Sequence, residues 1–285
     1  MRPLTPLIAL LLLLVAAEPL VAEGVREIND SYPKPPRVAI IIDDIGENIS
    51  AAKSLIALPA PLTFAVLPYT THNEYLAKLA YQSGKEVMLH QPMQPLDSAK
   101  RDRGMLMRDM SLLEMEQTLR QNLAQIPHAM GINNHMGSLL TQDSEKMGWL
   151  MRVLRLQGDY YFIDSRTSGA SIALKSARQY GIATLQRQIF LDNNLSNSEI
   201  SQQFQLLINH ARQYGSAIAI GHPYHETIAV LKALLPTLAQ HHIEVVPVST
   251  LIKQEAEPLI PYYQEIPLWQ ASLSPLQQDS KSLKQ

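Results

Sequence analysis

Short runs of apolar residues alternate along the chain with longer segments in which apolar residues recur every three or four positions. The first pattern is typical of strands buried on both faces, and the second of amphipathic helices. The predicted strands cover residues 38–42, 62–67, 86–90, 129–134, 160–163, 182–185 or 189–191, 217–220 and 243–248. The predicted helices cover residues 48–58, 74–82, 111–126, 144–157, 170–180, 197–214 and 227–240. This alternation predicts an α/β fold of parallel strands joined by right-handed crossovers, namely a (β/α) barrel of seven or eight units, complete, incomplete or distorted.

The two ends of the chain fall outside this pattern. Residues 1–22 combine Arg2, a short apolar run and small residues at Ala17 and Ala22, which predicts a signal peptide cleaved after one of these alanines. The run is shorter than the roughly 20 residues of a membrane-spanning helix, so we expect a membrane contact only if the signal is retained. Residues 23–36 are a predicted linker, 37–252 the barrel domain, and 253–285 a tail rich in Pro and Gln. The expected location is the periplasm.

Composition excludes several classes of function. The formal charge is −2 and no run of Lys or Arg interrupts the chain, which argues against a nucleic-acid partner. No glycine-rich phosphate loop follows a predicted strand, which argues against a nucleotide ligand. The chain has no cysteine and no G-x-S-x-G motif, so covalent acyl transfer has little support.

Residues suited to metal binding or acid–base catalysis follow nearly every predicted strand. They are Asp43, Asp44, His72, His90, His135, Asp164, Asp192 and His222. In a parallel barrel the carboxyl ends of all strands meet at one rim, so we expect these side chains to gather there. Imidazole and carboxylate ligands suit a divalent metal, with zinc as the first candidate, and such a metal activates water and polarises a carbonyl group. The residue types therefore favour metal-assisted hydrolysis.

The same residues lie in motifs that resemble a known family. The pair Asp43–Asp44 after a hydrophobic strand, with GKEVMLH at 84–90, resembles the first two motifs of the polysaccharide deacetylases, a superfamily of carbohydrate esterases. The segments LPYTTH (67–72), HQPMQP (90–95), GINNHMGS (131–138), YFIDSRT (161–167) and AIAIGHP (217–223) resemble its divergent branch of exported bacterial proteins. The resemblance covers residues 37–252.

The resemblance implies a role for each residue that matches a family motif. By position, Asp43 is the general base, Asp44 and His90 are metal ligands, His222 is the general acid, and Asp164 is the carboxylate that orients this histidine. The implied reaction removes an acetyl group from an N-acetylated sugar of a cell-envelope glycan, such as peptidoglycan.

The chain departs from the family pattern at the third metal ligand. The second histidine of the family's H-x-x-x-H motif falls at Gln94, and the arginine-containing third motif is replaced by Asn133, Asn134 and His135. We expect His135 to supply the missing ligand or to face the substrate. His72 is the alternative ligand, and Asn134 is a further candidate for binding metal or substrate.

Two residues keep two interpretations each. Arg166 either pairs with Asp43, as the family's arginine does, or forms a surface ion pair. Asp192 either supports the site from behind or caps a helix.

Two functions of different class follow from the sequence. The first is a metal-dependent hydrolase acting on acetylated glycan. The second is a catalytically silent glycan-binding or envelope-scaffold protein that keeps the barrel without full metal ligation. Hydrolysis of another ester or amide at the same metal site is a third option.

Overall fold

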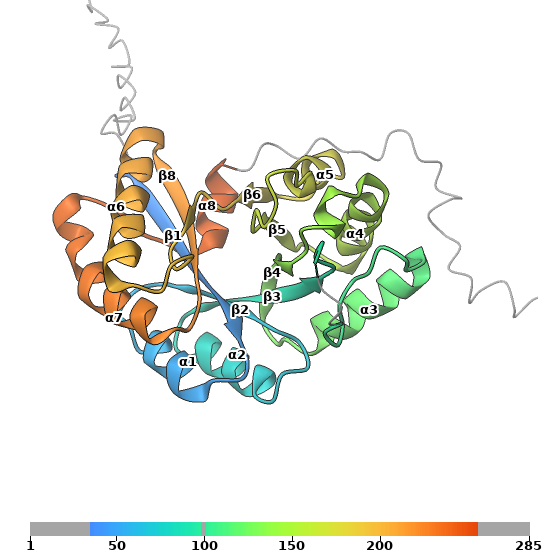
Figure 1. Ribbon diagram of the computed structural model, residues 1–285, viewed down its shortest axis with the longest axis horizontal. Helices are drawn as coiled ribbons and strands as arrows, with labels where there is room; N and C mark the ends of the chain where they lie inside the picture. The colour runs from blue at the N-terminus through green and yellow to red at the C-terminus, as the bar shows by residue number, and fades with distance from the viewer. Residues whose placement is uncertain (1–34, 98–100, 256–285) are drawn as a thin grey trace, which may run out of the picture. The chain divides into compact units, whose positions relative to one another are not determined.

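The computed structural model describes residues 35–97 and 101–255 (Figure 1). The predicted signal peptide (1–22), most of the predicted linker (23–36) and most of the predicted tail (253–285) lie outside the described residues. The strands are β1 (Arg37–Ile45), β2 (Thr63–Val66), β3 (Glu86–Met93), β4 (Ala129–Met136), β5 (Tyr161–Asp164), β6 (Thr184–Gln186), β7 (Ile189–Phe190), β8 (Ser216–Gly221) and β9 (Glu244–Val245). The helices are α1 (Ile49–Ile56), α2 (Asn73–Gln82), α3 (Leu112–Ala124), α4 (Ser144–Gln157), α5 (Ala173–Gln179), α6 (Asn197–Tyr214), α7 (His225–Leu234) and α8 (Val248–Glu255).

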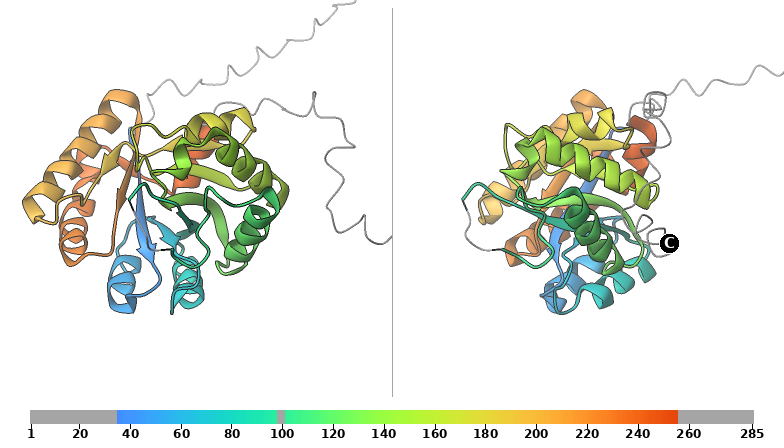
Figure 2. Two further views of the ribbon diagram at one scale, coloured as in Figure 1. Left: turned by 45° about the vertical axis from the view of Figure 1, so that its right-hand side comes forward. Right: turned by 90° about the vertical axis from the view of Figure 1, so that its right-hand side faces the viewer.

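The strands form one parallel sheet whose order is β6-β5-β4-β3-β2-β1-β8-β7, with β9 paired to β1. Helices α1 to α7 surround the curled sheet on its outside (Figures 1 and 2). β6 and β7 lie at opposite ends of this order, yet only Arg187 and Gln188 separate them in the chain. The two edges of the sheet must therefore come close together without pairing, and the predicted barrel is confirmed as an incomplete one, open between β6 and β7.

Arg187 and Gln188 connect the two unpaired edges. The Arg187 backbone N–H donates to the Asp164 carbonyl of β5 at 3.0 Å. On the other side, Gln188 donates its backbone N–H to the Ile218 carbonyl of β8 at 2.9 Å and accepts the Ile218 N–H on its side-chain oxygen at 2.7 Å. Both candidate strands for this part of the sequence therefore form, one on each side of the opening.

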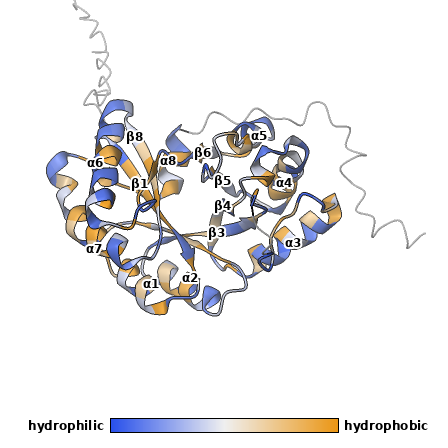
Figure 3. Cartoon of the chain, viewed as in Figure 1, coloured by the Kyte–Doolittle hydropathy of each residue, from blue (hydrophilic) through white to orange (hydrophobic). Residues whose placement is uncertain are grey.

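The unbroken apolar run of β1 supplies two separate cores. Val38, Ile40 and Ile42 pack outward against the surrounding helices, whereas Ala39 and Ile41 face the inside of the curled sheet. Successive side chains of a strand point to opposite faces, so a strand covered on both sides is apolar throughout. The helices are amphipathic and show both orange and blue surfaces in Figure 3.

The C-terminal part of the domain differs from the predicted strand over 243–248. β9 contains two residues, and α8 follows it, with Val248, Leu251 and Ile252 packed into the inner core. This spacing of i, i+3 and i+4 is helical and begins directly after Pro247, a residue compatible with a helix start. The helix also extends into the first residues of the predicted tail. Among the described residues, no helix has both the length and the apolar character needed to cross a membrane.

Candidate metal and catalytic site

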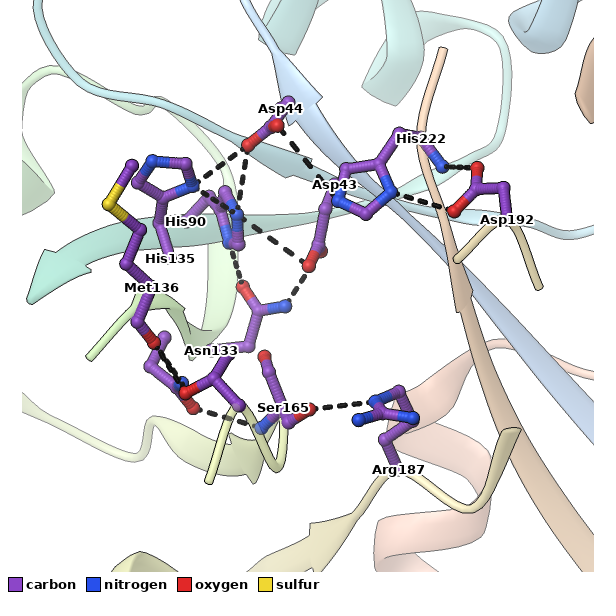
Figure 4. Close-up of polar contacts among 12 residues, drawn as sticks. Asp43, Asp44, His90, Asn133, His135, Met136, Ser165, Arg187, Asp192 and His222 are labelled. Atoms are coloured by element: carbon purple, nitrogen blue, oxygen red, sulfur yellow. Dashed lines mark hydrogen bonds and ion pairs between the residues drawn. The ribbon is translucent and has the colours of Figure 1, made fainter. Parts of the chain in front are cut away.

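The carboxyl ends of the strands surround a cavity of about 400 Å³. Its lining includes Asp44, His90, His135 and His222, which come from β1, β3, β4 and the residue after β8 (Figure 4). These side chains are far apart in the sequence. They converge because every strand is parallel and therefore ends at the same side of the sheet.

Three potential metal-ligand atoms form a compact triangle in this cavity. Asp44 Oδ1 lies 2.9 Å from His135 Nδ1 and 3.2 Å from His90 Nε2, and the two histidine nitrogens lie 3.2 Å apart. Ligands about 2.0–2.1 Å from a tetrahedral zinc ion are about 3.3 Å from one another. Within residues 35–97 and 101–255, this is the one group of three such residues close enough to hold an ion.

The environment of Asp44 supports this fit. Its Oδ1 is buried and has no well-directed hydrogen bond, although two imidazole nitrogens lie beside it. Burial by itself raises the pKa of a carboxyl group, but the His135 and His90 imidazoles outweigh it and hold the pKa of Asp44 well below its usual range. The three ligand atoms lie within 3.2 Å of one another, and the buried Asp44 Oδ1 has no hydrogen-bond partner in the described chain, which is the arrangement expected of cation ligands. The residues present therefore fit a divalent metal.

Asn133 links the candidate base to one of the candidate ligands. Its side-chain N–H donates to Asp43 Oδ1 at 2.7 Å, and its amide oxygen lies 2.7 Å from His90 Nδ1. An amide oxygen can only accept, so His90 carries its proton on Nδ1 when the ring is neutral and leaves Nε2 free to bind a cation. In the sequence, Asn133 is distinguished only as part of a replaced motif. The two-residue period of a strand could have indicated its role, because Asn133 and His135 are two positions apart and therefore share a face of the strand.

Asp43 is buried behind the triangle. Its Oδ2 lies 3.6 Å from His90 Nε2, and its other oxygen accepts the Asn133 hydrogen bond. Burial raises the pKa of Asp43, and the contributions of His90, His222 and Asn133 in the opposite direction do not cancel this effect. A buried carboxylate with a raised pKa is a stronger base than an exposed one.

His222 lies on another side of the cavity and is held by Asp192. Its Nε2 is 3.9 Å from Asp44 Oδ2, and its Nδ1 is 2.9 Å from Asp192 Oδ1. The second Asp192 oxygen accepts the His222 backbone N–H and the Thr227 hydroxyl at 2.6 and 2.7 Å. Burial lowers the pKa of His222, but Asp192, with the charges of Asp43 and Asp44, raises it to about 9. The imidazole is therefore protonated at neutral pH.

Asp164 does not make the contact with His222 that sequence analysis expected. Its Oδ1 accepts the Arg166 backbone N–H and its Oδ2 accepts the Ser171 hydroxyl, both at 2.8 Å. The strand order explains the difference, because β7, which leads into Asp192, pairs with β8, whereas β6 and the opening of the barrel lie between β5 and β8. Of the two interpretations of Asp192, the structure shows the one that supports the site.

His72 and Gln94 lie apart from the triangle. His72 precedes α2, its backbone N–H donates to the Gly46 carbonyl at 2.9 Å, and its ring is not among the three grouped ligands of the described chain. The Gln94 side chain accepts the Arg108 backbone N–H at 2.7 Å. Gln94, which replaces the family's second histidine, therefore holds a loop through its hydrogen bond to Arg108. His135 on β4 occupies the third corner of the triangle.

Asn134 and Arg166 line the cavity. Asn134 is not grouped with the metal-ligand atoms, and Arg166 does not pair with Asp43. The Asn134 amide donates to the Met136 carbonyl at 2.8 Å and accepts the Ser165 backbone N–H at 2.9 Å, so its side chain joins two strand ends. Arg166 makes no ion pair with Asp43 or with any other described residue. The arginine whose charge acts on Asp43 is Arg187, which sequence analysis did not single out.

Three residues that line the cavity have strained backbones. Asp44, Met136 and Arg166 have φ angles of 57°, 52° and 53°, the left-handed region that side chains other than glycine rarely adopt. They end or follow β1, β4 and β5. Such conformations cost about 1–3 kcal/mol each and are concentrated at functional sites.

Comparisons with known proteins show which family this fold and sequence belong to. A model of the divergent polysaccharide deacetylase family matches residues 40–252. An uncharacterized protein of Haemophilus influenzae is 35% identical over 235 residues, which are 81% of this chain and 83% of that protein. The uncharacterized protein YibQ of Escherichia coli is 36% identical over 218 residues, which are 76% of this chain and 68% of YibQ. The crystal structure of the uncharacterized protein ATU2773 from Agrobacterium tumefaciens has the same fold, with a TM-score of 0.73 at 22% identity over 76% of this chain and 89% of that one. This chain therefore belongs to the divergent polysaccharide deacetylase family.

Proposed function

We propose that the protein is a metal-dependent deacetylase that removes acetyl groups from N-acetylated sugars of a cell-envelope polysaccharide. The observation that carries the proposal is the triangle of Asp44, His90 and His135 with a candidate base, Asp43, and a candidate acid, His222, beside it. The family supplies the class of reaction, and zinc is the metal that best suits two imidazoles and one carboxylate.

Each side chain of the site has a task in this reaction. Asp44, His90 and His135 would hold the metal, which when bound activates water and polarises the acetyl carbonyl group. Asp43 accepts a proton from the attacking water, since burial has raised its pKa. His222 is protonated at neutral pH and donates a proton to the departing amine, with Asp192 fixing its ring.

Two aromatic side chains beside His222 suit a sugar ring. The rings of Phe190 and Tyr224 lie beside His222 in tilted orientations, with centroids 5.5 and 5.6 Å from that of the imidazole. Tyr224 is 43% exposed. An aromatic side chain combines a flat apolar surface with low conformational freedom, which suits the apolar face of a pyranose. With the predicted signal peptide, these features support a periplasmic glycan as the substrate.

The test measures metal content and acetate release on the mature protein loaded with zinc. We expect about one equivalent of zinc and release of acetate from N-acetylglucosamine oligomers. His135→Ala should lose both. His72→Ala is the matched control, because His72 follows a neighbouring strand without reaching the triangle, and it should keep both.

The same experiment separates this function from the silent glycan-binding alternative, to which the loss of the second motif histidine at Gln94 lends support. A protein that binds the oligomers but retains no zinc after reconstitution and releases no acetate would overturn the deacetylase proposal. Zinc binding in the wild type that His135→Ala leaves unchanged would overturn the assignment of the triangle.

A further inference from the structure

We propose that the cavity contains a second subsite, formed by Arg166 and Arg187, that binds a carboxylate of the substrate, so that the natural substrate is an acidic glycan. The identification of the ligand as a glycan rests on the proposed function. The anion subsite rests on the two arginines themselves, which line the same cavity as the metal-ligand triangle.

Arg187 is a partly buried guanidinium held in place by backbone groups. Its Nε donates to the Ser165 carbonyl at 2.7 Å and its Nη2 to the Arg166 carbonyl at 3.0 Å. Its charged carbon lies 4.9 Å from the centre of the Phe190 ring. In the described part of the chain it makes no ion pair, and Nη1 has no hydrogen-bond partner. The side chain is therefore fixed and retains N–H donors for a ligand.

Arg166 brings a second positive charge to the same wall. Its backbone is used structurally, since its N–H donates to Asp164 and its carbonyl accepts from Arg187. Its guanidinium makes no hydrogen bond or ion pair with any residue of 35–97 or 101–255. Burial lowers the pKa of Arg187 and the charge of Arg166 adds to this effect, whereas the carboxylates of Asp43 and Asp164 act in the opposite direction.

A third polar group of this wall also lacks a partner. Ser165 is 4% exposed, and its hydroxyl has no hydrogen-bond partner among the described residues. A buried hydroxyl without a partner is energetically unfavourable, so a site that keeps one is expected to satisfy it when a ligand or water is bound. Ser165 lies between Asn134, whose amide holds its backbone, and Arg187.

The chemistry of these groups selects the ligand. A planar guanidinium matches a carboxylate through paired N–H···O bonds, and such charge-assisted bonds are stronger than neutral ones. A neutral N-acetyl sugar offers only hydroxyl and amide groups and forms no ion pair with either arginine. A sugar carrying a carboxylate, as N-acetylmuramic acid does through its lactyl ether, would place its N-acetyl group and its acid group in one cavity.

The test compares two ligands that differ in one group, by calorimetry on zinc-loaded protein at fixed ionic strength. The probes are the disaccharide of N-acetylglucosamine and N-acetylmuramic acid, and the same disaccharide with its carboxylate converted to carboxamide. We expect the acid to bind at least tenfold more tightly than the amide. Arg166→Gln should reduce this preference to a few-fold or less. Arg120→Gln removes the same charge from an exposed pair with Glu116 outside the cavity and should leave the preference unchanged.

Binding and acetate release are measured separately, so the two proposals fail in different ways. Equal binding of acid and amide overturns the subsite, even if both release acetate. A clear preference for the acid without acetate release supports the subsite and overturns the deacetylase. A preference that Arg166→Gln leaves intact overturns the assignment to this wall, and absence of binding by either disaccharide overturns the acidic-glycan proposal.

Discussion

Asn133 is predicted to control both the stability of the site and its affinity for metal. Its side chain is fully buried, and its two hydrogen bonds join Asp43 to His90, which are themselves almost completely buried. Asn133→Ala leaves a carboxylate oxygen and an imidazole N–H without partners. A buried polar group that loses its partner costs about 1–3 kcal/mol, so the metal-free variant should lose about 3 kcal/mol of unfolding free energy. For a domain of this size the Tm should fall by about 6–12 °C.

The effect on metal binding follows from the tautomer of His90. Without the Asn133 oxygen, His90 Nδ1–H is no longer fixed, and the ring can present the wrong nitrogen or turn away from Asp44. Loss of such an outer partner typically lowers metal affinity by about 10–100-fold. The assay is competition for zinc against a chelator of known affinity, with thermal unfolding of the metal-free protein measured in parallel.

Asn134→Ala is the matched control. Asn134 is the next residue and is equally buried, but its strong hydrogen bonds go to the backbones of Met136 and Ser165. The control should lower the Tm to a similar extent while zinc affinity changes by no more than a few-fold. Unchanged zinc affinity in Asn133→Ala, or an equal loss in Asn134→Ala, would refute the argument that the amide acts through His90.

Two further predictions concern titrating groups, one in the cavity and one at the start of α4. Asp192→Asn should bring the pKa of His222 down from about 9, so that the ring loses its proton nearer neutral pH in an NMR titration of metal-free protein. The wild-type stabilisation from this pair should be complete below pH about 6.5 and disappear as the pH rises through about 9. Asp143→Ala removes the N-cap of α4, which accepts the backbone N–H groups of Glu145 and Lys146, and should cost about 1 kcal/mol in urea unfolding at pH 7. Although partial burial opposes it, these hydrogen bonds and Arg108 lower the pKa of Asp143, so this difference should be present above pH about 4 and shrink as the pH falls through the lowered value. A difference that persisted undiminished at pH 2 would contradict the capping explanation.

The ends of several helices could be predicted from the local sequence. Ser111 and Glu114 form the capping box that the sequence Ser-Leu-Leu-Glu predicts, and α6 ends at Gly215 in a left-handed conformation. Such boundaries depend on hydrogen bonds between residues a few positions apart, which a local pattern contains. The sequence pattern does not predict α8, because the partners of this helix, Glu86 at the Ser249 N–H and the inner core at Leu251, come from distant parts of the chain.

The metal-ligand residues could be predicted from the sequence for a similar reason. Asp44, His90 and His135 lie at or near the ends of strands, and parallel strands bring those ends together whatever their order. The sequence does not decide equally well between His135 and His72 as the third ligand, because both residues follow strands that end at the same rim. The choice depends on how the sheet curls.

Sequence by itself determined the alternation of strands and helices, the parallel direction of the strands, and the gathering of acid–base and metal-ligand side chains at one rim. The periods of hydrophobic residues and the residues that follow each strand contain this information. Only the tertiary structure decided that the barrel opens between β6 and β7, that Asp192 rather than Asp164 holds His222, and that Asn133 joins Asp43 to His90. These facts depend on which strands are neighbours and in what register. Neighbours and register are set by the packing of the whole core, and no local stretch of sequence contains them.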